Sequence, residues 1–366
     1  MSSRSSILSL ALLGAGVFLL VLAAMLAWYV EPHAKRTPVD IDDTVVFAGT
    51  GSYFDTGSLR PVHGETLTVT RRVVGDVAAA ERSGRAVWDV STTIDTPATL
   101  AAHDPRRSFQ WTLARWVTDR RTNAPVHCCG ETPAIRGEAF LKFPFDLEKR
   151  RYRWWDETLG AAVPLDYRGT VKVRGHRGYR FTGVVPDTRV GGRQVPGTLV
   201  GLPAQPQVLA EEWYANAGVD LVVDPRTGRV IDARIAPRKT LRAPGANSAS
   251  VVLLDSDNIR FTEETRRRQV HLAEEDGAKL ELVGETAPLA ASALGALLTA
   301  LGVLLLVRGA GTRPHPEPDA EPGHEPTPEP GHEPGAEPHR HARFRWLPHR
   351  RTGPIRRRDS GRPAPN

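Results

Sequence analysis

Two long segments without a charged residue, one near each end of the chain, most constrain what this sequence can fold into. Residues 7–30 and 287–307 contain no Asp, Glu, Lys or Arg. About 20 helical residues cross the hydrocarbon core of a bilayer, so each segment is long enough to form a transmembrane helix. A cleaved signal peptide is the alternative for the first segment, but its apolar region would be only about 7–15 residues long. Trp28 and Tyr29 close the segment, and these residue types are typical of a membrane interface, so we expect an uncleaved anchor.

The second segment has a buried core helix as its alternative. Its length, its lack of a polar stripe and the cation Arg308 directly after it favour a membrane span. Gly295 and Gly302 lie seven residues apart and could share one helix face. This spacing is not a GxxxG motif, so it leaves open how the two spans pack.

The charges beside the two spans predict their orientation, because positively charged flanks stay on the cytoplasmic side. The flanking charges are Arg4 and Arg308 on the terminal sides, and Glu31, Lys35, Arg36 and Glu285 on the sides facing the middle of the chain. Lys35 and Arg36 weaken the first signal, but the two spans agree. We expect a plasma-membrane protein with residues 1–6 and 308–366 in the cytoplasm and residues 31–286 outside.

Residues 308–366 differ in composition from the rest of the chain. They hold 13 of the 30 prolines, and the block Pro-Gly-His-Glu-Pro occurs at 322–326 and again at 330–334. Proline at this density prevents helix and sheet pairing, so we expect a disordered, solvated tail. Loose metal binding by its histidines is the alternative to a polar spacer.

The tail ends in a basic cluster, which we expect to contact anionic lipids. Its members include Arg350, Arg351, Arg356, Arg357 and Arg358. Each cation near a negatively charged membrane surface contributes about 1 kcal/mol of binding free energy. Nucleic acid is the competing partner, but a tail tethered to a bilayer meets lipid first, so we expect no nucleic-acid binding. A solvated topology signal explains the cluster equally well.

The region between the spans, residues 31–286, has the pattern of a mainly β domain. Alternating, β-branched segments recur at short intervals and are separated by turn sequences. The expected strands are 66–74, 86–94, 109–118, 169–173, 179–185, 208–214, 220–223, 230–235 and 250–254. This spacing predicts a β-sandwich or a strongly curved, partly open barrel. A helix is expected at about 262–284, leading toward the second span, because two acidic residues lie in its first turn.

The sequence His127-Cys128-Cys129-Gly130 is the most unusual local feature. Thiols outside the membrane tend to be oxidised. Cys128 and Cys129 could form a vicinal disulfide that stiffens a loop, pair with another chain, or remain reduced and buried, and we favour the vicinal disulfide. A catalytic cysteine with His127 as its base would need a stabilised thiolate in this compartment, which makes it the least favoured interpretation.

An aromatic segment follows the cysteines and is the candidate contact site for a lipid or a partner. Its aromatic residues are Phe143, Phe145, Tyr152, Trp154 and Trp155. The plain interpretation is that these rings anchor the edge of the core. The functional interpretation is an apolar patch or the rim of a pocket.

Motifs of known enzymes are missing from the chain. No GxSxG elbow, HExxH helix or phosphate-binding Walker loop occurs. Two cysteines cannot form a four-thiolate zinc site. We therefore expect no enzymatic activity, no metal and no cofactor.

Several motifs together resemble an actinobacterial family of two-pass membrane proteins, the PorA-family porins, long classed as a domain of unknown function. The motifs are Pro-Val-Asp-Ile-Asp at 38–42, Cys-Cys-Gly at 128–130, Phe-Pro-Phe-Asp at 143–146, the aromatic stretch at 152–156 and Pro-x-Thr-Gly at 225–228. The resemblance covers about residues 7–310. Members of the family occur in bacteria with complex envelopes, and some are associated with envelope glycolipid trafficking.

The resemblance implies a membrane-anchored accessory protein of envelope assembly, which binds a lipid or glycolipid outside the membrane and exchanges it with a transporter. Two helices cannot line a water-filled pore without oligomerising, so the porin label itself is a weak guide to function. The alternative is an interaction protein that scaffolds an envelope complex without a ligand. An enzyme of envelope metabolism is a more distant third.

Overall fold

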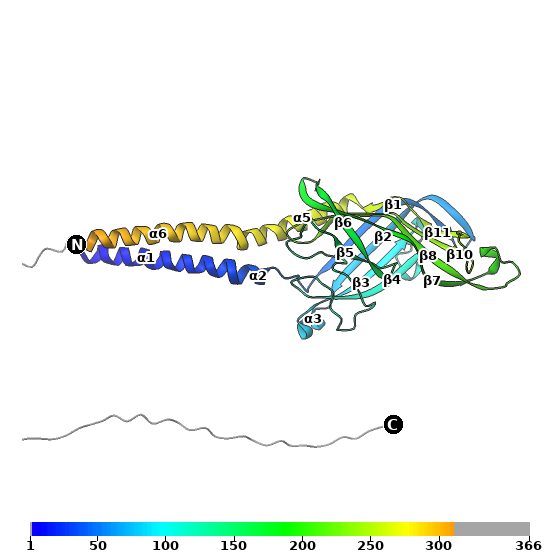
Figure 1. Ribbon diagram of the computed structural model, residues 1–366, viewed down its shortest axis with the longest axis horizontal. Coiled ribbons are helices and arrows are strands. Elements are labelled where there is room, and N and C mark those ends of the chain that lie inside the picture. The colour runs from blue at the N-terminus through cyan, green and yellow to red at the C-terminus, as the bar shows by residue number, and fades with distance from the viewer. Residues whose placement is uncertain (1, 311–366) are drawn as a thin grey trace, which may run out of the picture. The chain divides into compact units, whose positions relative to one another are not determined.

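The computed structural model describes residues 2–310, which form two long helical segments and one β domain (Figure 1). The helical segments are α1 (Ser2–Met25), the π-helical turn η1 (Leu26–Val30) and α2 (Glu31–Ala34) at the start, and α5 (Glu263–Glu281), the π-helical turn η4 (Leu282–Thr286) and α6 (Ala287–Ala310) at the end. By length and composition, the stretches Ile7–Ala34 and Glu263–Arg308 can each cross a membrane.

The β domain is one antiparallel sheet of twelve strands. The strands are β1 (Asp42–Asp55), β2 (Arg60–Gly75), β3 (Ala86–Asp95), β4 (Gln110–Thr118), β5 (Tyr152–Asp156), β6 (Ala161–Val173), β7 (His176–Val195), β8 (Val208–Val223), β9 (Val230–Ile235), β10 (Pro237–Arg242), β11 (Val251–Asp255) and β12 (Ile259–Phe261). The main path runs β4-β3-β2-β1-β11-β10-β8-β7-β6-β5, and β12 and β9 form a second connection between β1 and β8.

The long strands β1 and β8 each change partner along one edge, which bends the sheet. Strand β1 pairs with β12 at Phe47 and with β11 at Ser52. Strand β8 pairs with β10 around Trp213 and with β9 around Leu221. The β7–β8 pairing also contains three shifts of register. Bulges and changes of partner increase local bending and twist, so the sheet curves around its own core.

Short elements and one long loop complete the domain. The short elements are α3 (Val77–Ser83), α4 (Pro97–Leu100) and the 3₁₀ turns η2 (Pro105–Arg107) and η3 (Gly197–Val200). The loop of residues 119–151 joins β4 to β5 and buries Ile135, Phe140 and Phe143. Its Ala139 also forms a bridge to Trp154 of β5. The loop therefore belongs to the core although it has no regular secondary structure.

The predicted fold class is confirmed: a mainly antiparallel β domain lies between two long apolar helices. A single curved sheet replaces the sandwich alternative. The segments expected as strands lie in β2, β3, β4, β6, β7, β8, β9 and β11, whereas β1, β5, β10 and β12 were not expected. Helix α5 lies in the region where a helix leading to the second span was expected. The predictions for residues 311–366, including Arg350, Arg351, Arg356, Arg357 and Arg358, lie outside the described residues.

Helices α1 and α6 pack against each other through small residues. A Cβ atom added to Gly16 would lie 2.3 Å from Oγ1 of Thr299 and 2.8 Å from the carbonyl oxygen of Gly295. A Cβ atom added to Gly302 would lie 2.8 Å from the backbone nitrogen of Leu13. Small residues of this kind allow close approach of two helices in a membrane, so the backbones of α1 and α6 lie close together at these positions.

Candidate ligand cavity

The concave side of the sheet encloses a cavity of about 250 Å³. Most of its wall consists of apolar side chains from both halves of the sheet. These include Val45, Phe47, Val69, Ile94, Trp154, Val219, Leu221, Ala233, Leu254, Ile259 and Phe261. Because the strand pattern places alternate residues on the inner face, the curved sheet itself supplies this apolar lining. The cavity therefore lies within the hydrophobic core, and several of its lining residues also pack against one another.

Two carboxylates lie in one polar wall of the cavity, and both have hydrogen-bond or ionic partners. Asp156 accepts a hydrogen bond of 3.0 Å from the hydroxyl of Tyr214 and another of 2.9 Å from the backbone N–H of Leu159. Glu157 forms an ion pair of 3.2 Å with Arg71. Burial raises the pKa of Asp156, although these hydrogen bonds oppose the change. The wall is thus a satisfied polar network across strands β2, β5 and β8.

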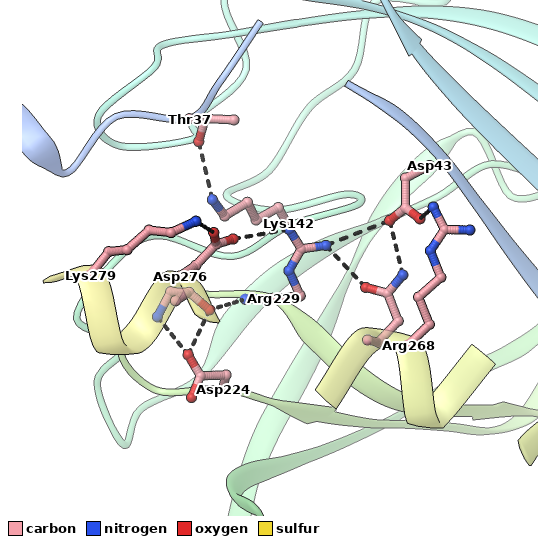
Figure 2. A network of polar contacts seen from close by, with 10 residues as sticks. Thr37, Asp43, Lys142, Asp224, Arg229, Arg268, Asp276 and Lys279 are labelled. Atoms are coloured by element: carbon pink, nitrogen blue, oxygen red, sulfur yellow. Dashed lines mark hydrogen bonds and ion pairs between the residues drawn. The ribbon is translucent and has the colours of Figure 1, made fainter. Parts of the chain in front are cut away.

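A second polar region lies where the cavity meets helix α5 (Figure 2). Arg229 lies between two acids, at 3.2 Å from Asp276 and 3.5 Å from Asp43. It also donates a hydrogen bond of 3.1 Å to the side-chain oxygen of Gln269 on α5. The contacts of Arg229 therefore join the sheet to the helix that continues into the second span.

Lys142 lies beside Arg229 but has different contacts. The two residues form a backbone bridge, which sets the loop carrying Lys142 against the start of β9. The ammonium group of Lys142 donates a hydrogen bond of 3.3 Å to the hydroxyl of Thr37 and lies 4.2 Å from the centre of the Phe145 ring. No carboxylate forms an ion pair with it among the described residues. Burial, together with the nearby charge of Arg229, lowers the pKa of Lys142 to about 7.

The connector from the first span forms part of the same end of the cavity. Thr37, Pro38 and Ile41 all line it, and helix α2 ends at Ala34. The connector is held in place because the backbone N–H of Thr37 donates a hydrogen bond of 2.7 Å to the carbonyl of Arg120. The polar end of the cavity is thus only a few residues along the chain from a membrane-spanning helix.

The aromatic residues singled out in the sequence lie in the core and in the cavity wall. Phe143, Tyr152 and Trp155 are buried, and Trp154 is partly buried beside the cavity. The rings of Phe143 and Trp154 stack with centroids 5.3 Å apart. Trp154 and Trp155 both line the cavity, whereas Phe145 lies over Lys142. The segment therefore forms no exposed patch, and its link to the candidate site is through the interior of the domain.

Cys128 and Cys129 are joined to each other by a disulfide. The pair packs against buried Ala79, Val87 and Val117. The ring of His127 forms a hydrogen bond of 2.6 Å with the carboxylate of Glu131, which closes the same loop. None of these residues lines the cavity.

Sequence reasoning missed the polar residues of the cavity. Lys142 stands directly before the aromatic motif, but a single lysine at that position gives no local signal of a site. Arg229 and Asp276 lie in a turn and on a helix, so no local pattern connects them with Lys142. Within residues 2–310, no group of three His, Cys, Asp or Glu side chains is placed to hold a metal ion.

Comparison with known proteins provides a family for the chain. A search of curated proteins finds no match. The sequence model of the family described as Porin PorA matches residues 8–304, which include both candidate spans and the whole β domain. Two apolar helices of sufficient length and this match together make the chain a membrane protein. The chain belongs to the PorA porin family.

Proposed function

We propose that the protein is a membrane-anchored, extracytoplasmic lipid- or glycolipid-binding protein that assists envelope assembly or lipid trafficking. The carrying observation is the largely apolar cavity inside the curved sheet. Ligand sites are typically apolar concavities with a few polar groups that orient the ligand. The Lys142 end and the Asp156 wall provide such groups.

The size of the cavity favours a single acyl chain as the part of the ligand that it encloses. Pockets for drug-sized ligands measure about 300–1,000 Å³, and this cavity of about 250 Å³ lies just below that range. A sugar head group or a second chain would have to remain outside. In the proposed function, the head group therefore stays accessible to a transporter or an envelope enzyme.

A pore within one chain is a poor alternative despite the family name. Helices α1 and α6 pack closely through Gly16 and Gly302. The twelve-stranded sheet has two ends, β4 and β5, that do not pair with each other. A sheet with unpaired edges cannot cross a membrane as a barrel, because its backbone groups would lack partners in lipid.

Enzymatic activity also has little support from the geometry. Three carboxylates line the cavity, and each has a side-chain partner. Asp156 is bound by Tyr214, Glu157 by Arg71 and Asp43 by Arg229. A general acid or base must form a hydrogen bond to the reacting group, and these carboxylates are already engaged by protein side chains. We therefore propose a binding protein and not an enzyme.

Filling the cavity tests the proposal. Val219 lines the cavity and is buried, whereas Val184 of β7 is 60% exposed. Val219→Trp in the full-length protein, purified in a mild detergent, is expected to reduce co-purifying lipid, measured by mass spectrometry, by at least about tenfold. Val184→Trp makes the same substitution on the outer surface and is expected to retain wild-type lipid content.

A smaller substitution guards against misfolding. Ala233→Leu also fills cavity space and adds less volume than Trp, so it should lower the lipid content by a smaller factor. Equal lipid in all three variants and the wild type would contradict the proposal, as would wild-type protein that carries no lipid.

A further inference from the structure

Lys142 is the cation of the cavity that lacks an acidic partner. Arg229, its neighbour, lies within 3.5 Å of carboxylate oxygens of both Asp43 and Asp276. The ammonium of Lys142 has the Thr37 hydroxyl and the face of the Phe145 ring as its partners. A buried charge without an opposite charge is costly and is expected where it has a function.

The surrounding acids are already engaged by other cations. Arg268 lies 3.3 Å from Asp43, and Lys279 lies 3.8 Å from Asp276, in addition to the contacts of Arg229 (Figure 2). Asp224 lies 2.9 Å from the ring of His176. An anion could therefore bind the ammonium of Lys142 without breaking any of these ion pairs.

The position of Lys142 relates it to the ligand of the cavity. Lys142 lines the same cavity as the apolar residues, at the end formed by Thr37 and Pro38 of the connector. An acyl chain that enters the cavity from the membrane side would leave its head at this end. The Thr37 hydroxyl donates its single proton to Oδ1 of Asn123 and accepts the hydrogen bond from Lys142, so it positions the ammonium and leaves the head group to Lys142.

We propose that Lys142 binds the acidic head group, a phosphate or a carboxylate, of the lipid whose acyl chain occupies the cavity. This inference rests on the proposed lipid-binding function and specifies the class of lipid. The ammonium forms a charge-assisted hydrogen bond to the head group, and Thr37, which accepts a hydrogen bond from the ammonium, holds Lys142 in place. The proposed ligand is thus an anionic amphiphile, and neutral lipids with the same chain bind less tightly.

Two amphiphiles with the same alkyl chain but different head groups distinguish the contribution of the head group to affinity from that of the chain. Decanesulfonate is anionic at every pH used, and decanol is uncharged. The full-length protein is first stripped of lipid in a nonionic detergent. The affinity of each amphiphile is then measured by titration calorimetry at pH 6, with the amphiphile kept below its own critical micelle concentration. Decanesulfonate is expected to bind at least about tenfold more tightly than decanol, since hydrogen bonds to charged groups contribute about 1.5–3 kcal/mol.

Three variants and two chainless anions complete the experiment. Lys142→Met is expected to lose the tenfold preference for decanesulfonate and to keep the wild-type affinity for decanol. Lys172→Met makes the same substitution at an exposed position of β6 and should leave both affinities unchanged. Lys142→Arg should keep the preference at pH 8.5, where the wild type loses much of it.

Methanesulfonate and inorganic phosphate test the head group without a chain. They are expected to bind the wild type at least about tenfold more weakly than decanesulfonate does.

The outcomes separate the two proposals. If decanesulfonate and decanol both bind but Lys142→Met retains the full preference, the assignment of Lys142 is wrong and the lipid-binding function stands. If inorganic phosphate binds as tightly as decanesulfonate, the site is one for free anions and the lipid assignment is overturned. If neither amphiphile binds to the wild type, the lipid-binding function itself fails.

Discussion

At the scale of single residues, the proposed binding role of Lys142 carries a cost in folding stability. Its ammonium is held beside Arg229 without a carboxylate partner, and burial lowers its pKa to about 7. A cation held in this way destabilises the folded domain until an anion arrives. In the proposed function, the unpaired charge of Lys142 also makes the site selective, because an uncharged ligand is not attracted by the ammonium.

Removal of this charge should therefore stabilise the ligand-free protein. Lys142→Met is expected to raise the free energy of unfolding by about 1–3 kcal/mol at pH 6, since it removes a partly buried charge that has the Thr37 hydroxyl but no carboxylate as its partner. The measurement is thermal unfolding of the full-length protein in detergent. The expected increase in Tm is about 2–4 °C per kcal/mol for a domain of this size. Lys172→Met is the matched control and should leave Tm unchanged.

The stability difference should also depend on pH in a defined direction. Because the folded-state pKa of Lys142 lies near 7 and the usual value is 10.5, the unfolded chain binds more protons between these values. The stability of the wild type therefore rises with pH across this window. The advantage of Lys142→Met should be largest below pH 7 and should shrink toward pH 10. The groups that face Lys142 are Thr37, Arg229, Asp224 and Asp276. A constant difference from pH 6 to 10 would contradict the lowered pKa.

At the scale of elements, the two membrane helices form a pair whose contact depends on a few glycines. Gly16 and Gly14 lie in the same helix, α1, but only Gly16 faces α6. A Cβ at Gly16 would lie 2.6 Å from the backbone nitrogen of Thr299, whereas a Cβ at Gly14 would have nothing within 4 Å. The seven-residue spacing of Gly295 and Gly302 on α6 matches this contact, although the sequence left its role open.

Substitution at these two glycines gives a matched test of helix packing. Gly16→Leu is expected to separate the helices in a bilayer, because the added side chain collides with the α6 backbone. Gly14→Leu should leave the packing unchanged. Distance measurement between spin labels placed on α1 and α6 of the full-length protein checks this. Equal distances in both variants would show that the helices do not meet at Gly16.

Helix α5 connects the membrane anchor to the sheet through buried polar contacts. The hydroxyl of Thr265 accepts a hydrogen bond of 3.0 Å from the backbone N–H of Val46 and donates one of 3.1 Å to its carbonyl. Gln269 donates a further hydrogen bond of 2.9 Å to Asp43. These contacts fix α5 to strand β1 beside the cavity, so the second span continues directly from a helix that packs on the cavity-bearing domain.

At the scale of the whole molecule, both ends of the domain lead into the membrane. The first span reaches β1 through a connector of seven residues, 35–41, and the second begins within the helix that packs on the sheet. We propose that this domain lies outside the cytoplasmic membrane, with both termini inside, as the flanking charges predict. In this topology, the connector residues Thr37 and Pro38, which line the cavity, follow the first span on its outer side.

Protease protection tests this orientation. In intact cells whose outer envelope layers have been removed, an added protease is expected to cleave the region 31–286 and to leave a tag at either terminus protected. Disruption of the membrane should then expose both tags to cleavage. Cleavage of either tag before disruption would contradict the proposed topology.

The elements were largely predictable because their signals are local. Apolar runs longer than 20 residues identify membrane spans, and alternation of β-branched residues identifies strands such as β2 and β3. Strand β5 (Tyr152–Asp156) was missed because its burial does not alternate: the neighbouring residues Trp154 and Trp155 both line the cavity. Strands β10 and β12 are short and carry charged residues, so their pairing depends on neighbours far along the chain.

The candidate site could be predicted only in part. The aromatic motif pointed to Trp154 and Trp155, which line the cavity, but the expected patch or rim lies inside the domain. Lys142 and Arg229 are 87 positions apart in the chain, and only the pairing of the loop with the start of β9 makes them neighbours. No composition or spacing rule contains that information.

The sequence by itself determined the two membrane helices, the β character of the domain between them and the family, because hydropathy, alternation and motifs are properties of neighbouring residues. Only the tertiary structure decided that the sheet is curved, that it encloses a cavity and that Lys142 stands there without an acidic partner. Curvature arises where β1 and β8 change partners. The lack of an ion pair at a charged residue can be recognised only when the positions of all its neighbours are known. The physical reason is that burial and charge pairing are sums over contacts distant in sequence.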